Sequence, residues 1–196
     1  MDRRAFIQRG AGLAMAATAA PAVQAASSES DGPVLLTVSG AVTHPNRGPL
    51  DPASDVLMSK HGVQFDRART YRYATLAAMA QHTIAPTLEY DGRAHTLRGP
   101  RLSTVLADAG APAGAATQVT LRAFDGYTLE SRVGEIERLG FILALTLDDA
   151  PMALGGLGPL WALYDADRIP EIAARPLPER FAGCPWGLYS IHVVPG

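Results

Sequence analysis

The residue types that most often carry chemistry are sparse in this chain and do not form the usual motifs. The five histidines show no HxxH or HxH spacing, so they do not predict a zinc site, and we interpret each as a surface or internally satisfied residue. They are His44, His61, His82, His95 and His192. Cys184 is the single cysteine, which excludes an intramolecular disulfide and any multi-cysteine metal site built from one chain. The G-x-S-x-G motif of serine hydrolases is absent from the sequence.

Three further patterns could belong to a site, but each also has a structural interpretation. The segment 155–158 (GGLG) lacks the G-x-G-x-x-G spacing and the following helix of a dinucleotide fingerprint, so it indicates a turn or a close approach of backbone to a ligand. The segment 125–127 (DGY) predicts a turn first and a site second, because Asp-Gly is common in turns. The acidic pair at 148–149 is typical of a solvated turn at a strand end.

Composition and charge indicate an ordinary globular domain without a nucleic-acid footprint. The chain has 196 residues, of which 47% are hydrophobic and 18% are charged. Its formal net charge is −2, and Lys60 is its single lysine. This balance offers no basic surface for nucleic acid or for an anionic membrane.

The first 25 residues are typical of a cleavable signal peptide. Arg3 and Arg4 are followed by Phe6, then by a weakly apolar run rich in Ala and Gly, and then by the small-x-small pattern at 23–25. The arginine pair and the weak apolar run predict the twin-arginine export route, which often carries proteins with a cofactor already inserted. The run is too short for a membrane anchor, and no later segment reaches ~18 apolar residues. We therefore expect a periplasmic protein without an anchor after cleavage, with a flexible linker at 26–33.

Short apolar segments punctuated by Gly and Pro predict an α+β fold, mainly β, in one domain over residues 34–196. An Asp-Gly turn at 91–92 predicts a hairpin over 88–97, and the segments 44–60 and 165–180 are predicted to be long loops. The patterns predict strands at 34–40, 71–73, 118–124, 141–147, 159–164 and 186–194, and short helices at 76–81, 102–109 and 135–139.

Four pieces of the chain between residues 97 and 194 match motifs of one known family in the right order. They are LRGPRLSTVLADAGA, AFDGYTLESRVGEIE, FILALTLDDAPMAL, and GLGPLWALY with the later CPWGLYSIHVV. The front half agrees more loosely through LLTVSGAV and YRYATLAAMAQHTI. With these pieces the chain resembles the oxidoreductase molybdopterin-binding domain, which implies the sulfite-oxidase-type fold and a strand on each side of the Gly-Tyr at 126–127.

The chain also departs from the catalytic members of that family. Their molybdenum-binding cysteine lies upstream of the LRGP-like piece, but here the segment 81–98 has no cysteine, and we expect Cys184 to lie on the wrong side of the fold. The loop 155–159 has neither the His nor the basic residues that hold the cofactor's phosphate, and Pro185-Trp186 stands where Lys-Trp is usual. This pattern resembles the short exported branch, whose members bind free pterins and report them to a membrane cyclic-di-GMP enzyme.

The resemblance implies a concave site between the 125–127 turn, the 155–161 loop and strand, and the 88–101 hairpin and helix start. A pterin needs aromatic walls for stacking and a few fixed polar groups. The candidates for walls are Trp161, Tyr164, Tyr127 and Trp186, those for polar edges are Asp125, Glu89 and Arg101, and Gly158 is the candidate for close backbone approach. We expect no catalytic residue and no metal ligand in this site.

Two functions remain open at this stage. The first is a non-catalytic, exported sensor of a free, reduced pterin that signals to a membrane-bound sensor or cyclic-di-GMP enzyme. The second is a periplasmic molybdenum-cofactor oxidoreductase, with molybdopterin as its ligand and an unusual metal site. The absence of the molybdenum-binding cysteine and of the phosphate-binding residues favours the first function, and the twin-arginine leader favours the second.

Overall fold

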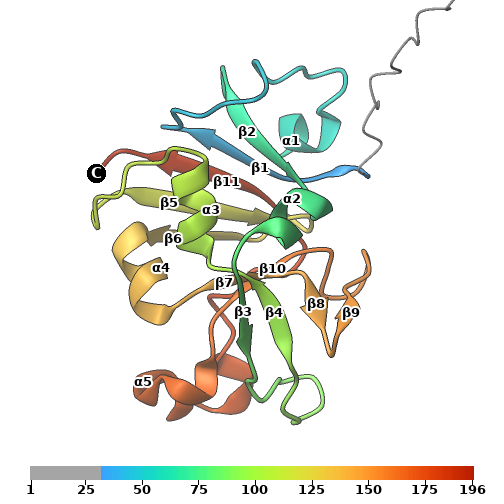
Figure 1. The fold of residues 1–196 in the computed structure, drawn as a ribbon, viewed down its shortest axis with the longest axis vertical. Helices are drawn as coiled ribbons and strands as arrows, with labels where there is room; N and C mark the ends of the chain where they lie inside the picture. The colour runs from blue at the N-terminus through green and yellow to red at the C-terminus, as the bar shows by residue number, and fades with distance from the viewer. Residues whose placement is uncertain (1–31) are drawn as a thin grey trace, which may run out of the picture.

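The computed structural model describes residues 32–196 (Figure 1). The predicted signal peptide, residues 1–25, and all but the last two residues of the predicted linker, residues 26–33, lie outside the described residues. Within residues 32–196, no helix is long and apolar enough to cross a membrane.

The larger sheet has five strands in the order β2-β1-β11-β5-β6 and occupies the upper half of Figure 1. At its centre, β1 (Val34–Gly40) pairs in parallel with β11 (Leu188–Val194), whereas the other neighbours are antiparallel. The remaining strands are β2 (Ala68–Arg72), β5 (Gln118–Ala123) and β6 (Thr128–Arg132). The first and last strands of the domain therefore lie side by side in one sheet.

The core is formed by buried side chains of these strands that pack against two helices. On β5, Val119, Leu121 and Ala123 are buried while the residues between them are not. Helix α3 (Leu102–Asp108) and helix α4 (Val133–Leu139) bury their apolar faces in the same cluster. Gly140 ends α4 in the left-handed conformation, with φ of 68°.

Two smaller sheets lie below the larger one in Figure 1. One has the order β3-β4-β8-β9, and the other pairs β10 with β7. Their strands are β3 (Gln81–Ile84), β4 (Leu97–Pro100), β7 (Ile142–Ala144), β8 (Thr146–Leu147), β9 (Ala150–Pro151) and β10 (Trp161–Leu163). Strand β4 lies close beside β7, and a Cβ on Gly99 would lie 1.8 Å from the carbonyl oxygen of Leu143, so this close approach requires glycine.

The predicted class, α+β and mainly β in one domain, is confirmed. The predictions for 34–40, 102–109 and 118–124 each agree with an element to within one residue, and the last strand begins two residues later than predicted. The predicted hairpin over 88–97 forms a tight turn in which Thr87 and Ala94 make an isolated bridge. The strand that the resemblance placed after the Gly-Tyr at 126–127 is β6.

Several predicted boundaries are wrong. The predicted helix at 76–81 is α2 (Tyr73–Ala78), because the side-chain amide of Gln81 donates to the carbonyls of Leu76 and Met79, both at 2.9 Å, and residue 81 begins β3. The predicted strand at 141–147 is divided between β7 and β8. The two predicted long loops contain α1 (Val56–Lys60), and η1 (Ala166–Arg168), α5 (Pro170–Ala173) and η2 (Leu177–Glu179).

Candidate functional site

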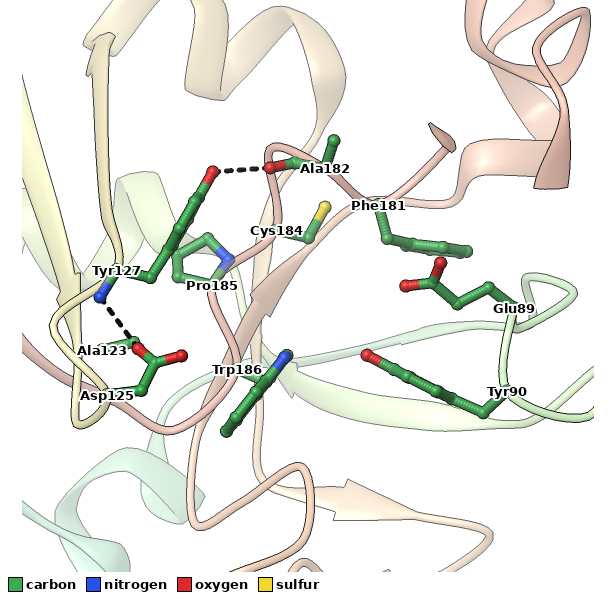
Figure 2. A pocket seen from close by; sticks show the side chains of 10 residues that line it. All are labelled: Glu89, Tyr90, Ala123, Asp125, Tyr127, Phe181, Ala182, Cys184, Pro185 and Trp186. Atoms are coloured by element: carbon green, nitrogen blue, oxygen red, sulfur yellow. Dashed lines mark hydrogen bonds between the residues drawn. The ribbon is translucent and has the colours of Figure 1, made fainter. Parts of the chain in front are cut away.

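A cavity of about 200 Å³ lies where three distant segments of the chain meet (Figure 2). The segments are the turn between β5 and β6, the turn between β3 and β4, and the stretch that leads into β11. The lining residues are Glu89, Tyr90, Ala123, Asp125, Tyr127, Phe181, Ala182, Cys184, Pro185 and Trp186. The structure thus brings together four of the residues considered from the sequence: Glu89, Asp125, Tyr127 and Trp186.

The turn between β5 and β6 fixes the orientation of the Asp125 carboxylate. The backbone N–H of Tyr127 donates to Oδ1 of Asp125 at 2.8 Å, and Gly126 adopts a positive φ of 90°. The N–H of Phe124 donates to the carbonyl of Gly187 at 3.1 Å, which ties this turn to the start of β11. In Figure 2 the second carboxylate oxygen of Asp125 points away from its own turn, toward the side of Trp186. That oxygen is available to a ligand.

Aromatic rings line the cavity on both sides of this carboxylate. Tyr127, Trp186 and Tyr90 are 42%, 39% and 57% exposed, so part of each ring is accessible from the cavity. The Tyr127 hydroxyl donates to the carbonyl of Ala182, so its ring is held beside the stretch that leads into β11. Burial, and then the neighbouring Glu89, raise the pKa of Tyr90 and keep its phenol a neutral donor. These rings can stack against a flat ligand.

Trp161 and Tyr164, predicted as walls, are core residues behind the cavity. Trp161 is fully buried, and its Nε1–H donates to the carbonyl of Cys184 at 2.9 Å. Tyr164 is also buried, and its hydroxyl donates to the carbonyl of Arg180 at 2.9 Å. Both therefore hold the backbone of the lining segment in place, and the exposed ring from that segment is Trp186.

The expectation that Cys184 lies on the wrong side of the fold is wrong, because the residue lines this cavity. Its side chain is 4% exposed, and Figure 2 shows it facing the same space as the carboxylate of Glu89. Burial raises the pKa of its thiol to about 12. The thiol of the ligand-free protein is therefore protonated at neutral pH, and a protonated thiol is a weak nucleophile.

Arg101 and Gly158 lie outside the cavity. Nη1 of Arg101 donates to the carbonyl of Gly140 at 2.8 Å, and the side chain lines a separate hollow together with Asp165 and Arg168. Gly158 packs so closely on Met152 that an added Cβ would lie 2.3 Å from the Met152 carbonyl oxygen. Glycine is therefore required at position 158 because the backbone packs directly against Met152.

Sequence reasoning missed Tyr90 and Phe181 and misplaced Cys184. Tyr90 directly precedes the Asp-Gly turn at 91–92, and an aromatic residue beside a predicted turn could have indicated an exposed ring. Phe181 and Cys184 lie between the predicted loop at 165–180 and the predicted strand at 186–194, and nothing in their spacing indicates which way they face.

The lining is acidic and aromatic. Among its members, Glu89 and Asp125 are acidic, and none is basic. Across residues 32–196, no three His, Cys, Asp or Glu side chains are arranged to hold a metal ion. The site can therefore offer stacking surfaces and hydrogen-bond acceptors, and it suits a small flat ligand with N–H donors.

Comparison with known proteins adds no assignment: models of known protein families give no match, and a search of curated proteins gives no significant one.

Proposed function

We propose that this protein is an exported, non-catalytic binder of a free, reduced pterin, built on the sulfite-oxidase-type fold. It would report ligand occupancy to a membrane-bound partner such as a sensor or a cyclic-di-GMP enzyme. The export part of the proposal is carried by the arginine pair, the weak apolar run and the small-x-small pattern within residues 1–25.

One observation carries the ligand proposal: the Asp125 carboxylate lies beside the exposed rings of Tyr127 and Trp186 in one cavity. The 2-amino group and N3–H of a pterin form a donor edge that a carboxylate accepts with two parallel hydrogen bonds. The bicyclic ring of the pterin needs an aromatic surface for stacking. Glu89 offers a second acceptor across the cavity, which suits the additional ring N–H groups of a reduced pterin.

The size and charge of the cavity favour a pterin without an anionic tail. Its volume of about 200 Å³ is below the ~300–1,000 Å³ usual for drug-sized ligands, so it suits a single bicyclic ring. A phosphate group would face two acidic side chains and no lining Arg or Lys.

The alternative, a molybdenum-cofactor oxidoreductase, is favoured by the twin-arginine pattern and by the position of Cys184 in the cavity lining. The rest of the lining does not fit molybdopterin. The cofactor's phosphate has no basic partner in the lining, where the charged side chains are the carboxylates of Glu89 and Asp125.

The proposal is tested by anaerobic calorimetric titration with tetrahydropterin. Asp125→Asn keeps an acceptor for the N–H of Tyr127 but removes the charge, so the fold should persist while binding weakens by roughly 10- to 100-fold, equivalent to ~1.5–3 kcal/mol. Tyr127→Phe, which loses its bond to Ala182 but keeps its ring, should weaken binding less.

Asp149→Asn is the matched control. Asp149 is an exposed carboxylate outside the cavity with φ of 63°, a conformation that Asn tolerates. It should bind as wild type does. If wild type binds no tetrahydropterin, or if Asp125→Asn binds as tightly as wild type, the proposed site is wrong.

A further inference from the structure

A charged cluster outside the cavity connects two turns, one of which carries the lining residues Glu89 and Tyr90. His95 lies between two carboxylates: its Nδ1 is 2.7 Å from Oδ2 of Asp148, and its Nε2 is 2.9 Å from Oδ2 of Asp91. Asp91 belongs to the same turn as the two lining residues, whereas Asp148 belongs to the turn between β8 and β9.

The turn that carries the lining residues is closed by its own backbone. The N–H of Leu88 donates to the carbonyl of Arg93 at 2.8 Å, and the carbonyl of Leu88 accepts from the N–H of Gly92 at 3.0 Å. The N–H of Arg93 also donates to Oδ1 of Asp91 at 3.0 Å. Glu89 and Tyr90 lie within this hydrogen-bonded turn, so we expect a displacement of Asp91 to displace them as well.

The second turn holds its carboxylate equally firmly. Oδ1 of Asp148 accepts the N–H of Thr96 at 2.9 Å, while the N–H of Asp148 donates to the carbonyl of Thr96 at 2.8 Å. Asp148 and Asp149 both have a positive φ, which makes the connection between β8 and β9 tight. The other oxygen of Asp148 is left for His95.

The charge of the imidazole decides whether this bridge can hold. A carboxylate only accepts, so both ring nitrogens of His95 must donate, and only the protonated imidazolium has two N–H groups. The carboxylates of Asp148 and Asp91 raise the pKa of His95 above its usual value, and His95 lowers the pKa of each carboxyl. Arg93 is the other charged side chain acting on Asp91. After deprotonation, one ring nitrogen presents its lone pair to a carboxylate.

We propose that His95 is a proton-operated latch on the ligand cavity. As an imidazolium it holds the turn of Glu89 and Tyr90 against the β8–β9 turn, and loss of its proton loosens that turn and lowers ligand affinity. The N–H of Thr87 donates separately to Oδ2 of Asp167 at 2.7 Å, so the base of the turn stays anchored. The effect on affinity rests on the proposed function, whereas the latch itself needs no ligand.

The latch is tested in ligand-free protein by amide hydrogen exchange over residues 88–96. Protection factors, which remove the intrinsic pH dependence of exchange, are compared between about pH 5.5 and about pH 9. In wild type, protection of the turn should fall by roughly two- to fivefold as pH rises, the range expected for partly exposed ion pairs. In His95→Gln it should be low and independent of pH.

His82→Gln is the matched control, because its side chain on β3 makes no ion pair among residues 32–196. This variant should keep the wild-type pH dependence. The latch is overturned if protection in wild type and in His95→Gln responds to pH in the same way.

A second arm measures tetrahydropterin affinity at the same two pH values. Wild type and His82→Gln should lose affinity by a similar factor as pH rises, beyond any change seen in His95→Gln. Equal pH dependence in all three proteins contradicts the effect on the ligand. If no pterin binds at either pH, the proposed function fails, and the exchange experiment alone decides whether the latch exists.

Discussion

The carboxylate of Asp125 divides its two oxygens between the fold and the cavity. Oδ1 accepts the N–H of Tyr127 at 2.8 Å, and the second oxygen is the one that Figure 2 shows directed away from the turn. Asn at this position keeps the first role and changes the second. This division lets a single substitution separate ligand binding from folding.

The burial of the Cys184 thiol gives a second test at the scale of a residue. Burial raises its pKa to about 12, against a usual value of ~8.5, so the thiolate fraction at neutral pH falls by about three orders of magnitude. We predict that iodoacetamide alkylates the folded protein about 10³-fold more slowly than the protein unfolded in denaturant. Cys184 is the chain's single cysteine, so mass spectrometry reads this rate directly.

A folded-state rate within about tenfold of the unfolded rate would mean an accessible thiolate. That result would contradict the burial of Cys184 and the raised pKa of its thiol.

Single residues show where sequence reasoning about the site succeeds and where it fails. Asp125 and Tyr127 were predictable, because an Asp-Gly turn between two alternating segments presents its side chains to solvent. Trp161 begins β10 and Tyr164 directly follows this strand. Their residue types alone do not reveal that the indole N–H and the phenol hydroxyl donate to backbone carbonyls inside the core. The direction of Arg101 depends on the carbonyl of Gly140, which is distant in sequence.

At the scale of elements, the close approach of β4 to β7 joins two of the smaller sheets, and β4 follows the turn that carries Glu89. An added Cβ on Gly99 would lie 1.8 Å from the carbonyl oxygen of Leu143, so Gly99→Ala must push the two backbones apart. We predict a loss of roughly 3 kcal/mol or more in the free energy of unfolding, measured by urea denaturation. The cost arises from backbone displacement, since no flexible side chain is there to move.

Gly114→Ala is the control for that prediction. The nearest atom to its added Cβ is Oγ1 of Thr117 at 3.5 Å, an ordinary contact, so its stability should stay within about 0.5 kcal/mol of wild type. A Gly99→Ala variant as stable as this control would show that the backbones of β4 and β7 do not approach each other so closely at Gly99.

The elements that the sequence predicts are those whose pattern is long enough to be read locally. Strand β1 is an apolar, β-branched run of seven residues closed by Gly40, β5 alternates over six residues, and α3 buries one face with a glycine after its end. The four-residue β3 and the five-residue α1 carry no such pattern. Gln81 ends α2 and begins β3 through a side-chain bond to backbone, which is a contact that periodicity does not encode.

At the scale of the whole molecule, the cavity exists only because distant parts of the chain are paired. Leu188 on β11 pairs with Ala123 on β5, which brings the stretch before β11 beside the 125–127 turn. Trp161 on β10 makes an isolated bridge with Trp186 and fixes the same stretch from behind. The lining thus combines residues more than 90 positions apart, and no local sequence pattern could have identified it in full.

The central claim is that this cavity holds one metal-free pterin through Asp125. Native mass spectrometry of the folded protein, incubated with excess tetrahydropterin under anaerobic conditions, tests the claim most directly. We predict a single added mass equal to one pterin per chain in wild type, strongly reduced in Asp125→Asn and unchanged in Asp149→Asn. No added mass in wild type, or a co-purified mass equal to molybdopterin with molybdenum, would contradict the claim.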